Sequence, residues 1–485
     1  MRDHVVATPV RIAAGFVAGL LGGFLFALTV GAFFNFVVHL LVSGVLGGLF
    51  GWAFGGRLHT GGASLVWGEA YGLLWWLFGY LTLVPLLTGN GLYWQPEQIR
   101  ALFPFLLGQI IAYGAALGLG YYLLVKLLQQ LGVAERPLIP EVTGPRGQEL
   151  LAPRLQSMIF GGIGGLFGGW LFLLGMQRAA FFPLVAGLVR SDSPEIGKLL
   201  HYLIAIVIGL GFGLLFHRDI RATGPAVVWG MTYGVSWWML GPMTLRPFLS
   251  GTTPSWSLAT AQATFTPLIS HMLYGALVGF IYASATKLWN VLFVDSDPLN
   301  RSREGAGARG VRGLLMGEAA GIVGGLLFTI VMVSINALPR VASLVGGSSS
   351  FVGFLVHLLI AFLVGSSFGV LFQNAATSYG SGLGWGLLYG LLWWLLGPNT
   401  LFFVLLRQPV DWSLAGAVGR YPALVGHLLF GMGLGLTFHY LLRRYDTHAM
   451  QPNEPHSDQT AGTPAPALWA VTLLVGVLLP LLLET

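Results

Sequence analysis

The chain has 485 residues, of which 55% are hydrophobic and only 9% are charged, and its mean hydropathy is +0.76. Soluble domains carry about 25% charged residues, so this composition excludes a soluble globular protein and predicts a polytopic membrane protein. The net charge of +6 comes from basic residues spread over short loops, which excludes a nucleic-acid partner. The sequence has no cysteine, and this excludes disulfides, iron–sulfur clusters, thiolate metal sites and cysteine nucleophiles.

One motif occurs three times along the chain. It begins at Trp67, Trp229 and Trp385, at intervals of 162 and 156 residues, and its shared frame is W-G-x-x-Y-G-x-x-W-W-x-x-G-x-x-T-L. A match of this length at regular spacing is typical of an internal repeat. Glycine accounts for 71 residues, about twice its usual share, which fits helices that pack closely in a membrane. The sequence therefore predicts an all-α fold built from three repeats.

Hydropathy predicts four transmembrane helices in each repeat, because each apolar stretch is close to the ~20 residues that a bilayer requires. In chain order the expected spans are 9–33, 35–55, 63–87 and 102–130, then 155–176, 198–217, 224–248 and 264–291, then 312–338, 351–373, 380–406 and 420–443, and finally a thirteenth at 466–483. The corresponding boundaries are repeat one, 1–131; a linker, 132–153; repeat two, 154–291; a linker, 292–311; repeat three, 312–444; a polar linker, 445–465; and a C-terminal transmembrane helix, 466–485.

An even number of spans in each repeat predicts that the three repeats run in the same direction across the membrane. Most of the 24 Lys and Arg residues fall on the side of the N-terminus. The positive-inside rule then places the N-terminus in the cytoplasm and the C-terminus, after thirteen spans, on the outer side. The first span is expected to be retained and not cleaved as a signal peptide, because its Gly-Gly pair recurs at 168–169 and 324–325. These features predict a bacterial-type inner-membrane protein whose partner is the lipid bilayer.

The third helix of each repeat carries an aromatic stripe at positions i, i+4 and i+8, and glycines four residues apart lie beside it. Such glycines give a second helix a flat face to pack against. Aromatic residues at helical spacing most often fill a packed core; the alternative is a wall for a flat ligand such as a quinone, a pigment or a porphyrin. The stripe consists of Trp67, Tyr71, Trp75, Trp229, Tyr233, Trp237, Trp385, Tyr389 and Trp393, and the glycines are Gly68, Gly72, Gly230, Gly234, Gly386 and Gly390.

Histidines recur at fixed distances from the motif. One precedes the first tryptophan by 28 residues in every repeat, and another follows it by 42 residues in repeats two and three, where repeat one has Gln109; the histidines are His39, His201, His357, His271 and His427. The predicted topology places all five in the outer third of the membrane. Three roles remain open: hydrogen bonds to a facing helix, proton relay, and axial ligation of a b-type haem by the histidine pairs of repeats two and three.

Two acidic residues fall inside predicted helices, Glu69 in the motif and Glu318 near the start of repeat three, and neither has a counterpart in another repeat. An intramembrane acid is a functional candidate, whereas an acid near a helix end also suits a position that faces water. The sequence contains no P-loop and no HExxH motif, and no Ser-His-Asp set or carboxylate pair recurs. No metal site and no enzyme activity are therefore expected.

Several of these residues stand in an order that resembles a known family. His201, Trp229-Gly230, Leu240-Gly241-Pro242 and His271, with Gly426-His427 as a second Gly-His pair, make each repeat similar to the YagU-like uncharacterised bacterial inner-membrane proteins. The resemblance implies an inner-membrane location and a role related to pH, since those single-unit proteins are linked to acid resistance, and it implies no catalytic residues. The triplication, the Trp-Trp pair and the thirteenth helix depart from the pattern of that family.

The sequence thus predicts a non-enzymatic integral membrane protein, either a channel or transporter-like conduit or a proton-homeostasis factor that uses the outer histidines. This function requires no cofactor. The alternative is a cofactor-binding subunit, with haem or another flat ligand against the aromatic stripe, or a scaffold subunit of a larger membrane complex. In that case other membrane subunits would be its partners.

Overall fold

The computed structural model describes residues 6–31, 35–58, 60–134, 151–176, 178–220, 222–293, 306–449 and 476–482. These residues form helices joined by short loops, and none of them lies in a β-strand. Eleven of the helices are long and apolar enough to cross a membrane. The prediction of an all-α polytopic membrane protein is therefore confirmed.

The long helices follow one order around each occurrence of the motif, and the helices around one occurrence form one copy; in the second and third copies a short helix, α9 or α16, lies between the first two long ones. The first copy contains α1 (Thr8–Thr29), α2 (Phe36–Phe54), α3 (Gly61–Trp75), α4 (Val84–Leu87), α5 (Pro96–Ala101), α6 (Phe103–Leu107) and α7 (Ala116–Gln130). The second contains α8 (Leu151–Phe172), α9 (Arg178–Ala186), α10 (Pro194–Phe216), α11 (Thr223–Leu240), α12 (Arg246–Leu249), α13 (Leu258–Ala263) and α14 (Phe265–Phe293). The third contains α15 (Ala306–Ser334), α16 (Leu338–Ala342), α17 (Ser350–Phe372), α18 (Tyr379–Leu396), α19 (Phe402–Leu405), α20 (Leu414–Gly419) and α21 (Tyr421–Ala449), and α23 (Leu479–Leu482) follows.

The helix that carries the motif is interrupted in every copy by a π-helical turn, which begins at the second residue of the Trp-Trp pair in the first copy and three residues after it in the other two. In each turn the motif threonine donates its hydroxyl proton to the backbone carbonyl five residues earlier, at 2.8 or 2.9 Å. The proline of the second and third turns is absent from the first, so the three turns share the threonine bond and the motif glycine. A side chain that bonds a carbonyl in this way disturbs the regular helical ladder. The turns span Trp76–Leu83, Gly241–Leu245 and Gly397–Leu401.

The fourth long helix of the first copy contains one extra residue. Gln109 and Tyr113 are four positions apart, whereas His271 and Tyr274 of the second copy are three apart. In both copies one motif glycine contacts this helix before the position of the extra residue, and the other motif glycine contacts it after that position. The segment between these contacts, Gly108–Ala115, is π-helical, because one added residue widens a helical turn and leaves its ends in place.

Glycines hold the helices of each copy together. The paired motif glycines of α3, α11 and α18 lie so close to the fourth helix that a Cβ atom on any of them would press against its backbone. Glycines bring the first and second helices together in the same way, for example Gly19 with Gly47 and Gly317 with Gly365. Helices in lipid associate through such close packing, since lipid tails are as apolar as leucine side chains.

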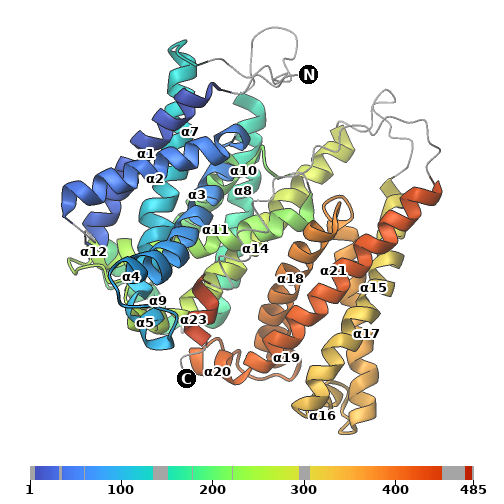
Figure 1. Ribbon diagram of the computed structural model, residues 1–485. Coiled ribbons are helices and arrows are strands. Elements are labelled where there is room, and N and C mark those ends of the chain that lie inside the picture. The colour runs from blue at the N-terminus through green and yellow to red at the C-terminus, as the bar shows by residue number, and fades with distance from the viewer. Residues whose placement is uncertain are drawn as a thin grey trace.

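The three copies lie in chain order, with the second copy in the middle. Figure 1 shows the blue helices of the first copy and the orange helices of the third on opposite sides of α11 and α14. The start of α3 contacts the end of α10, where Gly62 meets Phe216, and the start of α11 contacts the end of α17, where Gly224 meets Phe372. The motif helix thus meets the following copy in the same way at both seams.

Two predicted spans are not among the eleven helices. The helix α11 contains Thr, Ser, Trp and Tyr residues and is buried along nearly its whole length, so it has little contact with lipid and little need of an apolar surface. The expected span 466–483 lies outside the described residues except for 476–482, which are helical and place α23 against α13 and α20. The linkers expected at 132–153, 292–311 and 445–465 also lie mostly outside the described residues.

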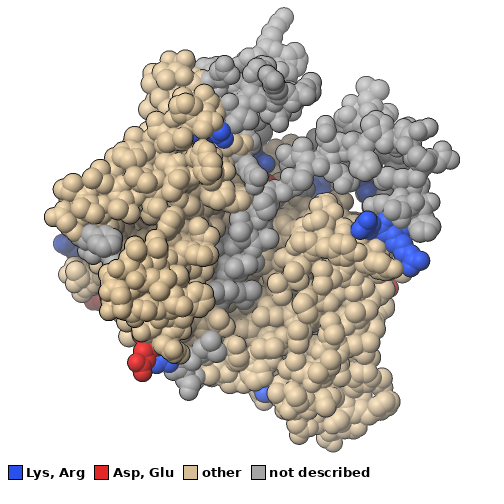
Figure 2. Space-filling model, viewed as in Figure 1, with Lys and Arg blue, Asp and Glu red and all other residues tan. Residues whose placement is uncertain are grey.

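The surface of the described helices suits contact with lipid. In Figure 2 the broad central area of the visible face carries neither basic nor acidic side chains where residues are described. Large apolar side chains are exposed along the outward faces of the helices, such as Leu199, Leu203 and Val207 on α10. Apolar surface of this extent marks contact with a membrane or with another protein.

Candidate functional site

The first histidine of each copy binds the Gly-Gly pair of the preceding helix. Its Nε2–H donates to the carbonyl of the second glycine at 2.9–3.1 Å, and all three imidazoles are buried. Because a carbonyl oxygen only accepts, Nε2 carries the proton and Nδ1 keeps its lone pair. Sequence spacing singled out both the histidines and the glycines, and the structure joins them in the pairs His39–Gly23, His201–Gly169 and His357–Gly325.

The second histidine of repeats two and three donates from the other ring nitrogen. His271 and His427 each donate from Nδ1 to the carbonyl four residues earlier in the same helix, at 2.7 Å. Their Nε2 atoms therefore keep the lone pair, and they lie beside Gly241 and Gly397, where the motif helix is interrupted. In the first copy Gln109 replaces this histidine and donates to the hydroxyl of Tyr80 at 3.3 Å.

One phenylalanine contacts both histidines of a pair. The ring centroid of Phe172 lies 5.5 Å from that of His201 and 4.9 Å from that of His271, and Phe328 lies 5.1 Å from His357 and 4.6 Å from His427. Sequence reasoning missed this residue, although it always stands three positions after the Gly-Gly pair. Ligation of a haem iron through Nε2 of His201 would break the bond from that nitrogen to Gly169.

The aromatic stripe is packed against the second helix of its own copy. The three motif tyrosines donate to a carbonyl 25 residues earlier, at 2.7–3.1 Å. Phenylalanine rings of the second helix lie against each tyrosine and against the tryptophan that opens the motif, with centroids 4.8–5.6 Å apart. These rings are Phe50, Phe54, Phe212, Phe216, Phe368 and Phe372. They occupy the face of the aromatic stripe on which a flat ligand is the alternative to core packing.

The two tryptophans of the Trp-Trp pair have different surroundings. The first is half-buried and meets the motif tyrosine edge to face, with centroids 6.0–6.2 Å apart. The second is buried, and its indole N–H donates to a backbone carbonyl at the start of the fourth helix, at 2.9–3.1 Å. The second tryptophans are Trp76, Trp238 and Trp394. The second position therefore joins two helices of one copy, whereas the first packs along its own helix.

A further tryptophan recurs that sequence reasoning missed. It stands 27 residues after the first motif tryptophan, and its indole N–H donates to the hydroxyl of the motif threonine at 2.9–3.2 Å. Its exposure differs among the copies: Trp94 is 59% exposed, Trp256 8% and Trp412 2%. Trp412 also packs against Gly175 of the second copy. The equivalent face of the first copy is thus left uncovered by the described residues.

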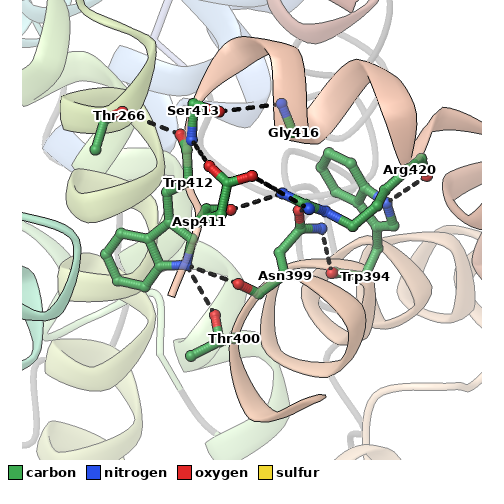
Figure 3. Close-up of polar contacts among 9 residues, drawn as sticks. All are labelled: Thr266, Trp394, Asn399, Thr400, Asp411, Trp412, Ser413, Gly416 and Arg420. Atoms are coloured by element: carbon green, nitrogen blue, oxygen red, sulfur yellow. Dashed lines mark hydrogen bonds and ion pairs between the residues drawn. The ribbon is translucent and has the colours of Figure 1, made fainter. Parts of the chain in front are cut away.

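A polar cluster distinguishes the third copy (Figure 3). Arg420 Nε donates to Asn399 Oδ1 at 2.7 Å, Arg420 Nη2 donates to the backbone carbonyl of Asp411 at 2.6 Å, and the Arg420–Asp411 ion pair measures 3.5 Å. Burial acts to raise the pKa of the Asp411 carboxyl, but hydrogen bonds from Ser413 and the charge of Arg420 outweigh it, so this pKa lies below its usual value. The other copies have apolar residues in place of Asn399, so the cluster braces one copy only.

The two intramembrane acids occupy different positions. Glu69 on α3 is completely buried and accepts a hydrogen bond from Ser236 Oγ on α11 at 3.2 Å. Glu318 on α15 is half-buried, and Ser366 on α17 donates to it at 3.4 Å. Glu69 therefore joins the first copy to the second, whereas the bond of Glu318 stays within the third.

Comparison of the chain with protein-family models, with curated proteins and with solved structures gave no match. Within the described residues, no three His, Asp or Glu side chains are grouped closely enough to hold a metal ion. The interpretation of function therefore rests on the geometry of the repeated polar residues and of the seams between copies.

Proposed function

We propose that this integral membrane protein is non-enzymatic and moves protons, as a conduit or as a proton-homeostasis factor, with the outer histidines as proton acceptors. The observation that carries the proposal is that each of the five histidines donates one ring N–H to a backbone carbonyl and keeps a lone pair on the other nitrogen. A neutral imidazole held in this way takes up a proton without giving up its structural hydrogen bond.

The finer architecture belongs to the same proposal. It comprises three parallel repeats of four spans and a thirteenth span, in a bacterial-type inner membrane, with the N-terminus in the cytoplasm and the C-terminus outside. Matching hydrogen bonds at matching positions support the repeats. The C-terminal end of α21 and the helix α23 lie at opposite ends of the molecule in Figure 1, which supports a further crossing between them. A resemblance to YagU-like proteins is consistent with a role related to pH.

Proton flux into sealed liposomes that contain the full chain tests this function. The variant carries glutamine at His39, His201, His271, His357 and His427, because a glutamine amide still donates to a carbonyl but does not titrate; the first copy already has Gln109 at one such position. We expect flux to fall roughly 100-fold or more, the lower end of what a positioned acid–base group contributes. The control is His217→Gln, which lies just after α10 and outside the repeated pattern.

A scaffold role is the second candidate, and the packing contacts favour it. The histidines, tyrosines and second tryptophans all form hydrogen bonds that join helices or brace one helix, as a purely structural set would. Under this function wild-type flux equals that of empty liposomes, or the glutamine variant conducts as well as the wild type. Either result would overturn proton movement through the histidines.

A further inference from the structure

The two seams between neighbouring copies use equivalent positions but differ in chemistry. At the first seam Glu69, two residues after the motif tryptophan of α3, meets Ser236, seven residues after that of α11. At the second seam the equivalent residues are Met231 and Leu392, and both line one apolar crevice between α11, α17 and α18. An apolar pair is therefore sufficient to pack such a seam, and the acid at the first seam calls for another explanation.

The carboxyl group lies inside the helix assembly and not at its end. Glu69 is 0% exposed, its partner Ser236 on α11 is 7% exposed, and Thr232, whose carbonyl lies near Ser236 Oγ, is 2% exposed. Glu69 follows the first residue of α3 by eight positions, or about 12 Å along the helix axis at 1.5 Å per residue. An ionisable group at such a depth is costly, and those that membrane proteins keep are generally functional.

One hydroxyl group is placed to serve both protonation states of the carboxyl. Ser236 Oγ lies 3.2 Å from Glu69 Oε1 and 3.5 Å from the backbone carbonyl oxygen of Thr232. An ionised carboxylate only accepts, so the serine proton then points to Glu69. A protonated carboxyl donates to Ser236 Oγ, and the serine proton then points to Thr232. Ser236 can thus stay hydrogen-bonded to the carboxyl in both protonation states, because its hydroxyl can rotate between these two acceptors.

Three tyrosines and one acid on or next to the surrounding helices have hydrogen bonds of their own. The hydroxyls of the neighbouring tyrosines donate to backbone carbonyls of second helices, in the pairs Tyr71–Leu46, Tyr113–Ser43 and Tyr233–Ile208. A second carboxylate, Asp219, accepts a hydrogen bond from Thr60. Thr60 directly precedes α3 and stands nine residues before Glu69. The hydrogen bond from Ser236 to Glu69, which crosses the seam, comes from an uncharged hydroxyl.

We propose that Glu69 is a proton-binding site at the seam between the first two copies, held by Ser236. The site takes a proton from water that reaches the seam and returns it by the same exchange, with no other reactant. It is separate from the outer histidines, because the ring N–H groups of those histidines bond to backbone carbonyls of their own copies. The histidine variant can therefore lose proton flux while this site still titrates, so the two proposals fail independently.

Infrared spectroscopy of the full chain in lipid tests the site through the C=O stretch of a protonated carboxyl. The titration covers about pH 4 to 9, from the value of a free Glu to that of a deeply buried one. We expect a band that is present at low pH, disappears as the pH rises, and is missing in Glu69→Gln. The matched control, Glu318→Gln, keeps the band.

The Ser236→Ala variant gives a second measurement that retains the acid. It should move the frequency of the same band, because the carboxyl loses its hydroxyl partner, and this difference identifies the band even if Glu69→Gln does not fold. The proposal is overturned if wild type and Glu69→Gln have identical carboxyl bands. It is equally overturned if the Glu69 band does not change with pH, since Glu69 would then be a fixed hydrogen-bond partner.

Discussion

The Gly230→Ala variant is expected to lose most of its folded yield and to unfold at a markedly lower temperature. Gly230 of α11 and Gly275 of α14 face each other so closely that a Cβ atom on either would overlap the carbonyl oxygen of the other. Overpacking typically costs about 1–3 kcal/mol when side chains can move aside. Here the obstacle is backbone, so the helices must separate, and α11 lies between the other two copies.

Thermal unfolding in detergent measures this effect, and Gly187→Ala is the matched control. Gly187 is exposed, and a Cβ atom there would meet no other atom within 4 Å. The control should unfold at the temperature of the wild type. A Gly230→Ala protein with the stability of its control would show that α11 and α14 do not touch along their backbones.

The Trp412→Ala and Trp94→Ala variants are expected to differ widely although the two tryptophans occupy equivalent positions. Trp412 is 2% exposed, donates to Thr400 and packs against Gly175 of the second copy, so its removal leaves a cavity at the seam. Buried tryptophans cost about 3–5 kcal/mol when they are truncated to alanine. Trp94 is 59% exposed, and its truncation should cost less than about 1 kcal/mol, as at other surface positions.

The same unfolding measurement compares the two variants, and Trp256→Ala should behave like Trp412→Ala because Trp256 is 8% exposed. The comparison tests whether the copies form an open row, in which the outer face of the first copy has no neighbouring copy. Equal destabilisation by Trp94→Ala and Trp412→Ala would contradict this arrangement. It would mean that another part of the assembled protein covers Trp94.

Composition was sufficient to predict the class of fold, and the motif spacing marked many residues that prove to be in contact. His201 and the Gly-Gly pair at 168–169 were both evident as repeated features. Their hydrogen bond was not, because spacing along a chain does not show which helix faces meet. The partner of each ring nitrogen could not be predicted for the same reason, because it depends on the packing.

Other features were regular in sequence and still unrecognised. Phe172 and Trp256 look like ordinary apolar residues of a membrane protein, and only their partners, His201 and Thr244, show that they belong to the repeated set. The π-helical turns leave no signal in hydropathy, since a hydroxyl bond to the carbonyl five residues earlier is local geometry. The pairing of Glu69 with Ser236 depends on how two copies meet, which no single repeat encodes.

Side-specific labelling of single cysteines tests the central claim, that three copies of one unit cross the membrane in the same direction. The chain has no cysteine, so each variant carries one thiol. Asn90, Thr252 and Gln408 are exposed and each follows its motif tryptophan by 23 residues; Gln130 and Arg444, exposed near the ends of α7 and α21, serve as positions on the opposite side. In intact cells an impermeant maleimide should label the first three variants, and it should label the last two only after permeabilisation. Protection of Thr252→Cys while Asn90→Cys and Gln408→Cys react would contradict the parallel arrangement.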